Sequence, residues 1–417
     1  MKILWIVNTI FPEPSKILGI PSPTIGGWMY GMAAQLSKAP NMKLAVATVY
    51  SGKDFKKMDI DGILYYLLPC KNMLKYDESL EKYWEQIAYD FIPDIIHING
   101  TESPIGLACM RIIPNANYVI SIQGLVSVYN RYYSSGISNL DIIKNFTFRN
   151  LIKRDSIFQL KNQFYQRGIF EKEYFKRAKH IIGRTNWDYA HTKALNSKVN
   201  YHFCNESLRE SFYLASKWSY ATAEKHTILL SQAHYPIKGL HQVIKAISML
   251  LSDYPNITLK IAGGNITKTD AFFDRFRLTN YGKYIKNLIK QCGLLNNVQF
   301  LDSMNEYEMI RAYQKTHVFV CPSSIENSSN SIGEAQLLGV PVVASYVGGI
   351  TNMVRDGETG LLYRFEEVEM LAENISKLFK DETLSLNISL NSIKTATKRH
   401  NRHNNFETLC NIYTKIT

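Results

Sequence analysis

A short segment between Cys321 and Gly349 combines two acidic side chains with a run of small polar residues. Glu326 is separated from Glu334 by seven residues, and the polar run between them is Asn327, Ser328, Ser329, Asn330 and Ser331. Ser and Asn can cap the helix predicted after this run, and the free N–H groups and positive dipole end of such a helix suit a phosphate. The carboxylate of Glu334 can accept hydrogen bonds from two adjacent hydroxyls, such as those of a ribose.

Each carboxylate also has a simpler explanation. Glu334 favours the positive end of a helix dipole, and Glu326 is an ordinary loop acid. For Glu334 alone this explanation would be preferred. The position of the segment favours a ligand site, because it begins at the carboxyl end of a predicted strand, the edge at which open α/β sheets bind ligands.

The elements that must position this segment alternate between strand and helix. Strands are predicted at 3–7, 44–49, 63–68, 95–98, 118–122, 180–183, 226–231, 259–262, 298–301, 318–321 and 342–345. Helices are predicted between them at 26–37, 80–92, 240–251, 284–292, 306–314 and 332–338, and a polar helical tail begins near 367. Short strands separated by helices indicate crossover units on a parallel sheet. The 417 residues accommodate two such doubly wound units, with a boundary near 205–225.

The pattern resembles the retaining nucleotide-sugar glycosyltransferases of glycosyltransferase family 4, which have two Rossmann-like domains facing a cleft, the GT-B fold. The two glutamates are followed by Ala335, by Gly-x-Pro-Val-Val at 339–343 and by Gly348-Gly349. Further resemblance lies at Gly26-Gly27, 94–97, Lys238-Gly239 and 356–362. Residues 183–188 and 205–209 are similar to a bacterial subset that acts in surface-polysaccharide assembly.

The resemblance implies a domain organisation and a donor site. Residues 1–208 would form the acceptor-side domain, 209–385 would bind the nucleotide sugar, and the helical tail 386–417 would return to the N-terminal domain. Glu334 would bind the ribose and Glu326 the donor sugar near the reaction centre. The backbone of 327–331, with Lys238, Gly26 and Gly27, would hold the diphosphate. The lysine point charge suits the leaving group, so Lys238 and Glu326 are the predicted catalytic residues, and no metal or cofactor is expected.

One departure from the family concerns the phosphate clamp. The family usually carries an arginine five residues before the lysine, where this chain has Ala233, or Gln232 if one gap is allowed. Either one phosphate-binding side chain is missing, or His234 or Arg184 replaces it.

A second departure concerns the acceptor side. The family often has His-Gly after a later N-domain strand, where this chain has Gln123-Gly124. Gln can hydrogen-bond a hydroxyl but cannot act as a base at neutral pH. His97 remains an acceptor-side candidate, although a lone histidine beside a strand is more often a structural hydrogen-bond donor.

Charge points to an anionic partner. The chain has 48 basic and 36 acidic side chains, a net charge of +12. Residues 144–179 contain ten Lys or Arg against three acidic residues, with aromatic residues interleaved. This stretch is either a solvated helix pair or a patch that sits on an anionic membrane. A nucleic-acid groove is less favoured, because no known nucleic-acid module is present.

These observations predict a retaining glycosyltransferase at the cytoplasmic face of the membrane. It would transfer a sugar from a nucleotide-diphosphate sugar to a glycan or lipid-linked glycan of a capsule, O-antigen or exopolysaccharide. No nucleophilic acid is clearly placed, which favours front-face departure and attack. A sugar-nucleotide epimerase of the same fold and a non-catalytic nucleotide-sugar- or glycan-binding protein remain as alternatives. No apolar run is long enough to span a membrane, no signal peptide is expected, and the dispersed cysteines suit a reducing compartment.

Overall fold

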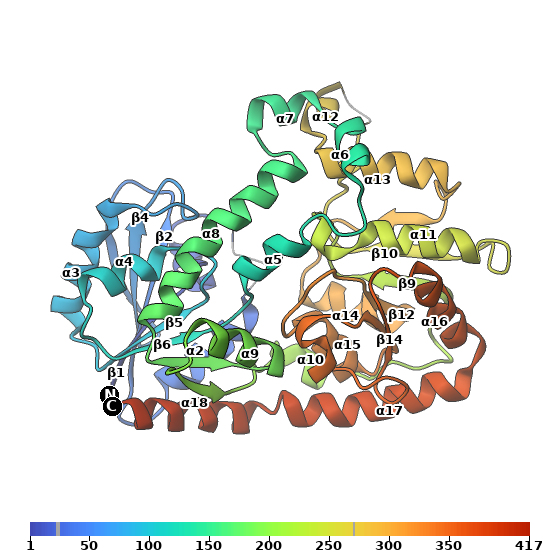
Figure 1. Cartoon of the computed structure of the whole chain (residues 1–417). Helices are drawn as coiled ribbons and strands as arrows, with labels where there is room; N and C mark the ends of the chain where they lie inside the picture. The colour runs from blue at the N-terminus through green and yellow to red at the C-terminus, as the bar shows by residue number, and fades with distance from the viewer. Residues whose placement is uncertain (22–25, 270–271) are drawn as a thin grey trace. The chain divides into compact units, whose positions relative to one another are not determined.

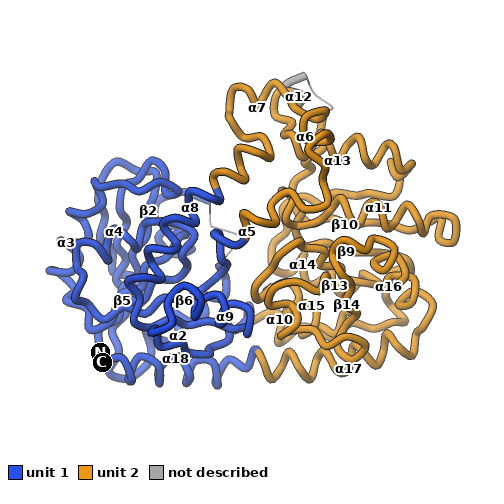
Figure 2. Tube along the Cα trace, viewed as in Figure 1, with its two compact units in different colours: residues 1–128, 164–209, 400–417 blue, residues 129–163, 210–399 orange. Residues whose placement is uncertain are grey.

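The chain folds into two compact units in the computed structural model, which describes residues 1–21, 26–269 and 272–417. The first unit comprises residues 1–128, 164–209 and 400–417, and the second comprises 129–163 and 210–399 (Figure 2). Each unit has its own sheet, and helices separate most of the strands along the chain (Figure 1).

The first unit is built on an eight-stranded sheet in the order β3-β4-β2-β1-β5-β6-β7-β8. Its strands are β1 (Lys2–Ile6), β2 (Lys43–Tyr50), β3 (Lys56–Ile60), β4 (Ile63–Pro69), β5 (Ile95–Asn99), β6 (Tyr118–Ser121), β7 (His180–Gly183) and β8 (Asn200–Phe203). Every pair is parallel except β3 with β4, which form an antiparallel hairpin. Asp61 and Gly62 close that hairpin with φ of 51° and 78°, the conformation that a tight hairpin turn requires.

Helices cover both faces of this sheet, because apolar residues of β1 alternate between two cores. Leu4 and Ile6 pack with α3 (Glu81–Phe91), α4 (Ile105–Ile112) and the later part of α8 (Ile157–Arg177). Ile3 and Trp5 pack with α2 (Gly27–Ser37) and α18 (Arg402–Ile416). The last helix therefore completes a core that begins with the first strand.

The second unit has a six-stranded, all-parallel sheet in the order β11-β10-β9-β12-β13-β14. Its strands are β9 (Glu224–Leu230), β10 (Thr258–Ile261), β11 (Val298–Phe300), β12 (Thr316–Cys321), β13 (Val342–Ser345) and β14 (Leu361–Tyr363). The main helices are α11 (Leu240–Leu250), α13 (Asn280–Gln291), α14 (Glu306–Lys315), α15 (Asn330–Leu338), α16 (Val368–Lys380) and α17 (Glu382–Arg399). Together the two sheets confirm the predicted class of two doubly wound α/β units.

The observed division differs from the expected domains in two places. Residues 129–163 group with the second unit, because α6 (Asn139–Lys144) is hydrogen-bonded to α13. Asn280 Nδ2 donates to the carbonyl of Ile142 at 2.9 Å, and Asn287 Nδ2 donates to Asn145 Oδ1 at 2.8 Å. The tail is also divided, since α17 packs against α15 in the second unit and α18 belongs to the first.

Every strand and helix predicted from the sequence is present, with ends shifted by a few residues. Three strands were not predicted, namely β3, β8 and β14. No helix among the described residues is both long enough and apolar enough to cross a membrane.

Candidate active site

Lys238 and Glu326 form an ion pair at the carboxyl edge of the second sheet. Lys238 ends the short 3-10 turn Pro236–Lys238 that follows β9, and Glu326 lies in the loop that follows β12. These two strands are neighbours, so the segments that leave their carboxyl ends meet. Lys238 Nζ lies 2.8 Å from Glu326 Oε2, and Ser323 Oγ donates to the same oxygen at 3.3 Å.

Backbone contacts fasten the lysine turn to the glutamate loop. The N–H of Ser324 donates to the carbonyl of Ile237 at 2.8 Å. Gly239 has φ of 71°, and a Cβ at this position would lie 1.8 Å from the carbonyl oxygen of Pro322. Only glycine therefore allows this approach, which explains the Lys-Gly pair seen in the sequence.

The glycine pair at 348–349 holds the other side of Glu326. The N–H of Gly349 donates to the carbonyl of Glu326 at 3.0 Å. A Cβ on Gly348, whose φ is 51°, would lie 2.0 Å from that same carbonyl oxygen. The glutamate backbone is thus held by the turn after β13 as well as by the lysine turn.

The ion pair is largely shielded from solvent, because the side chains of Lys238 and Glu326 are only 19% and 13% exposed. Burial is the largest single influence on Lys238 and lowers its pKa, but the charge and hydrogen bond of Glu326, with Tyr235 and Cys321, together hold that pKa above its ordinary value. Lys238 therefore remains a cation at neutral pH. Lys238 is thus a largely buried cation whose charge is balanced by Glu326.

The predicted polar run leads directly into α15. Ser329 occupies the N-cap position, but its side chain makes no capping hydrogen bond and lies 2.9 Å from Ser331 Oγ. Asn327 is fully buried. Glu334, in the second turn of the helix, is only 7% exposed. A buried carboxylate on the site helix suits hydrogen bonding to ligand hydroxyls.

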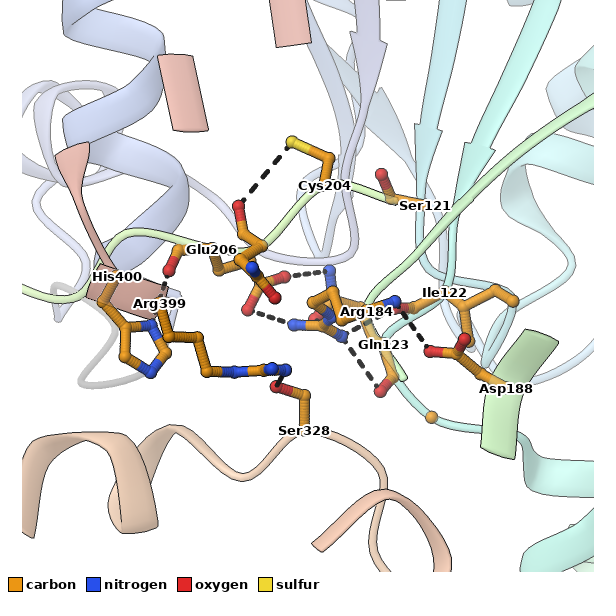
Figure 3. A network of polar contacts seen from close by, with 12 residues as sticks. Ser121, Ile122, Gln123, Arg184, Asp188, Cys204, Glu206, Ser328, Arg399 and His400 are labelled. Atoms are coloured by element: carbon orange, nitrogen blue, oxygen red, sulfur yellow. Dashed lines mark hydrogen bonds and ion pairs between the residues drawn. The ribbon is translucent and has the colours of Figure 1, made fainter. Parts of the chain in front are cut away.

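Arg399 brings a second cation to this loop, and the sequence analysis did not identify it. It is the last residue of α17, and its Nη2 donates to Ser328 Oγ at 3.2 Å (Figure 3). The contact exists because α17 packs against α15. No sequence motif marks it.

The missing family arginine is not replaced by its neighbours in an obvious way. Ala233 is buried, whereas Gln232 and His234 are exposed. The ring of His234 lies against Gly263, where an added Cβ would be 2.6 Å from its Cε1. This turn therefore presents an imidazole and an amide in place of a guanidinium.

Arg184 lies in the first unit, where it organises Gln123 and Glu206 (Figure 3). It forms an ion pair with Glu206, and its Nη2 donates to the carbonyl of Ile122 at 2.6 Å. Gln123 Nε2 donates to Glu206 Oε1 at 3.0 Å. The amide of Gln123 is therefore oriented by this buried ion pair.

His97 takes part in a chain of hydrogen bonds within the first unit. Its Nδ1 lies 2.6 Å from Tyr413 Oη and its Nε2 lies 2.7 Å from Ser121 Oγ. Trp5 Nε1 donates to the same tyrosine oxygen at 2.8 Å. Burial lowers the pKa of His97 to about 3, so the ring is neutral at pH 7. These contacts give the histidine a structural role between β5 and α18.

The N-terminal glycines open α2 in the first unit. Gly26 is the N-cap, with φ of 85°, and a Cβ on Gly27 would lie 2.9 Å from Arg209 Cγ. Four of the predicted residues, Gly26, Gly27, His97 and Gln123, therefore belong to the first unit. Lys238, Glu326, 327–331 and Glu334 belong to the second, where Lys238 pairs with Glu326 and the polar run leads into the helix that carries Glu334.

Metal-binding side chains do not gather in the described part of the chain, where no group of three or more His, Cys, Asp or Glu could hold an ion. The sequence contains one Asp-x-Asp pair, Asp59 and Asp61. Those aspartates lie on the edge hairpin of the first unit, Asp59 in β3 and Asp61 in the turn.

Residues 215–398 match the family model described as glycosyl transferases group 1. The chain is 28% identical over 148 residues to a D-inositol 3-phosphate glycosyltransferase from Corynebacterium urealyticum. The matched stretch is 35% of this chain and 33% of that protein. It is 29% identical over 181 residues to the capsular polysaccharide biosynthesis glycosyltransferase CapM from Staphylococcus aureus, 42% of each chain. The matched stretches thus span less than half the length of these two relatives.

Solved structures match over the whole length. Sucrose-phosphate synthase from Thermosynechococcus elongatus has a TM-score of 0.74 at 17% identity, over 100% of this chain and 99% of that one. Anabaena HepE in complex with UDP-glucose has a TM-score of 0.66 at 16% identity, over 100% of both chains. The fold is therefore GT-B, and residues 215–398 are similar to the group 1 glycosyl transferases.

Proposed function

We propose that the protein is a retaining glycosyltransferase that moves a hexose from a nucleotide-diphosphate sugar to a glycan acceptor, without a metal ion. The Lys238–Glu326 pair carries this proposal, because it places a cation and a carboxylate side by side at the ligand-binding edge of the sheet. Both residues lie within the stretch that matches the family model.

Lys238 and Glu326 would each leave the other and contact the donor when it binds. The diphosphate would take the ammonium of Lys238, and the released carboxylate of Glu326 would accept a hydrogen bond from a sugar hydroxyl. The amides at the start of α15 would add donors to the diphosphate, and Glu334 would accept from the ribose hydroxyls.

The chemical step is a substitution at the anomeric carbon. The bond from that carbon to the diphosphate oxygen breaks, and a bond to the acceptor oxygen forms on the same face. The acceptor proton passes to the departing diphosphate, whose developing charge is stabilised by Lys238. This route needs no histidine base, which agrees with the neutral and fully engaged ring of His97.

The similar proteins support a proposal for the donor and the acceptor. HepE was solved with UDP-glucose, which supports a UDP-hexose as the donor here. CapM acts in capsular polysaccharide biosynthesis, which supports a growing, lipid-linked glycan of the bacterial surface as the acceptor. Such an acceptor would place the enzyme at the cytoplasmic face of the membrane.

The first experiment is a thermal-shift series with nucleotide sugars, followed by hydrolysis of the stabilising donor without acceptor. We expect slow release of free sugar, lowered about 100-fold by Lys238→Ala. Lys260→Ala is the matched control, because Lys260 pairs with Glu224 at the amino end of β9. Recovery of an epimerised sugar would instead identify an epimerase, and binding without any turnover would identify a binding protein.

A further inference from the structure

We propose that the second unit carries a docking surface for an anionic lipid bilayer, formed by α6, α7 (Phe148–Lys153), the start of α8 and α12 (Phe272–Arg277). These helices are called the α6–α7 surface below. Eight large apolar side chains are exposed on it: Leu140, Ile143, Phe146, Phe148, Leu151, Ile152, Phe158 and Phe276. In Figure 1, α6, α7 and α12 lie together beside α13.

Both short helices expose apolar side chains, and α7 has its apolar side outward. On α7, Phe148, Leu151 and Ile152 have the i, i+3, i+4 spacing of one helix face, and the latter two are 66% and 63% exposed. The buried residue of the same helix is polar, since Asn150 is fully buried and donates to Asp155 Oδ1. On α6, Leu140 and Ile143 are likewise exposed at i, i+3.

The surface is held firmly to its own unit. Arg149 Nη1 donates to the carbonyl of Arg277 at 2.7 Å, and Lys283 Nζ donates to the carbonyl of Phe146 at 3.1 Å. The rings of Phe148 and Phe276 pack edge to face at 6.2 Å. The exposed side chains therefore belong to a fixed, folded element.

The exposed charges on α6 and α7 are cationic, and α12 adds one half-buried acid, Asp274. Lys144, Lys153 and Arg154 are exposed on α6 and α7. The two acids of residues 139–158 are half-buried and engaged, Asp155 in an ion pair with Arg149 at 2.6 Å and Asp141 with Ser138 Oγ. Exposed apolar side chains with exposed cations on the same helices suit the interface of an anionic bilayer. A second copy of the chain would bring the same cations together, which disfavours self-association through this surface.

This surface overlaps only the first part of the stretch 144–179 predicted from the sequence. Tyr174 and Phe175 are fully buried in the core of the first unit, so the expectation that the aromatic residues of α8 face a membrane is wrong for them. For that part of the stretch, packing of the aromatic residues inward is correct. The bilayer surface is confined to the segment that groups with the second unit.

The test is co-sedimentation of the full chain with phosphatidylglycerol vesicles and with phosphatidylcholine vesicles over a salt series. We expect binding to the anionic vesicles that weakens as salt rises, and little binding to the neutral ones. Leu151→Ser with Ile152→Ser should lower the partition coefficient about tenfold or more. Lys153→Glu with Arg154→Glu should remove the anionic preference.

The matched controls lie on α17 of the same unit. Leu386→Ser with Leu390→Ser removes two exposed leucines, and Lys394→Glu with Lys398→Glu reverses two exposed lysines. Both should bind vesicles like the parent chain. Arg149 is left intact, because its ion pair and its bond to Arg277 hold the surface together.

Three outcomes would overturn the proposal. These are equal binding to both vesicle types, no effect of the Leu151 and Ile152 changes, and lipid-free self-association that those changes abolish. None of the altered residues lies in the Lys238–Glu326 site, so donor hydrolysis should be unchanged in all variants. Co-sedimentation therefore reports on membrane binding alone, and donor hydrolysis reports on the proposed catalysis alone.

Discussion

Lys238 Nζ and Glu326 Oε2 lie 2.8 Å apart although the two residues are 88 positions apart in the chain. The pair joins the turn after β9 to the loop after β12, and glycines at 239 and 348 allow the backbones to approach. Each charge is therefore balanced by the other across the edge of the sheet. The proposed exchange of this pair for donor contacts is tested by the next prediction.

Glu326→Ala should depress sugar transfer by about 100-fold or more, because the donor sugar loses a hydrogen-bonding carboxylate near the reaction centre. The affinity for free nucleotide diphosphate should be unchanged or higher, because Lys238 is no longer neutralised. Initial rates and calorimetric titration measure the two effects. Glu358→Ala is the control, since Glu358 pairs with Arg355 on an exposed turn of the same unit. A variant with parental transfer would show that the glutamate motif has no catalytic role here.

Glu334→Gln should weaken the binding of free nucleotide diphosphate about tenfold, since a hydrogen bond to a charged group is worth about 1.5 kcal/mol or more. Glu334 is only 7% exposed on α15, so little bulk water can compensate for a lost hydrogen bond. Calorimetric titration gives the affinity, and Glu369→Gln on the exposed side of α16 is the control. Unchanged affinity would remove the ribose role.

The fold was predictable because the strands are short, apolar and β-branched. Residues 95–98 and 342–345 illustrate this, and their strands appear where the pattern placed them. The strand β3 was missed because Lys56, Lys57 and Asp59 make it too polar for an apolar-run criterion. The Asp61-Gly62 turn next to it was the available signal, since Asp-Gly between two strands is typical of a hairpin.

Parts of the site depend on tertiary contacts that no local pattern encodes. Glu326 and Lys238 could be identified by motif, but their direct pairing needs β9 beside β12. Arg399 reaches Ser328 only because α17 packs on α15. The polar chain from Trp5 through Tyr413 to His97 joins residues more than 300 positions apart. For this reason the hydrogen-bond partners of His97 could not be predicted from the sequence.

Sugar transfer should persist in EDTA. The reason is that Lys238, whose pKa is held above its ordinary value, supplies the positive charge for the departing diphosphate. The measurement is the initial transfer rate after EDTA treatment and dialysis, with and without added magnesium or manganese. A loss of rate in EDTA that either cation restores would contradict this prediction and would assign the charge to a metal ion.

The last prediction concerns Glu171, a fully buried carboxyl on α8 of the first unit. It accepts hydrogen bonds from the N–H groups of Val126 and Ser127, at 3.1 and 2.8 Å, and from Thr101 Oγ1 at 2.7 Å. Burial raises the pKa of Glu171 from 4.5 to about 7, and the nearby Glu102 adds to this rise. The carboxyl of Glu171 thus holds the start of α5 (Val126–Tyr132) through these hydrogen bonds. With a pKa of about 7, it is half protonated near neutral pH.

Between pH 4.5 and 7 the folded chain holds a proton on Glu171 that the unfolded chain has released, so this group's contribution to the free energy of unfolding falls as pH rises. Glu171→Gln removes that dependence. The free energy of unfolding of the variant minus that of the parent chain should therefore become more positive from pH 5 to pH 8, by about 3 kcal/mol at most. Urea unfolding across this range measures the difference, with Glu85→Gln on the exposed side of α3 as a control that stays flat. A flat or falling difference for Glu171→Gln would mean that this carboxyl is ionised in the folded chain throughout the range.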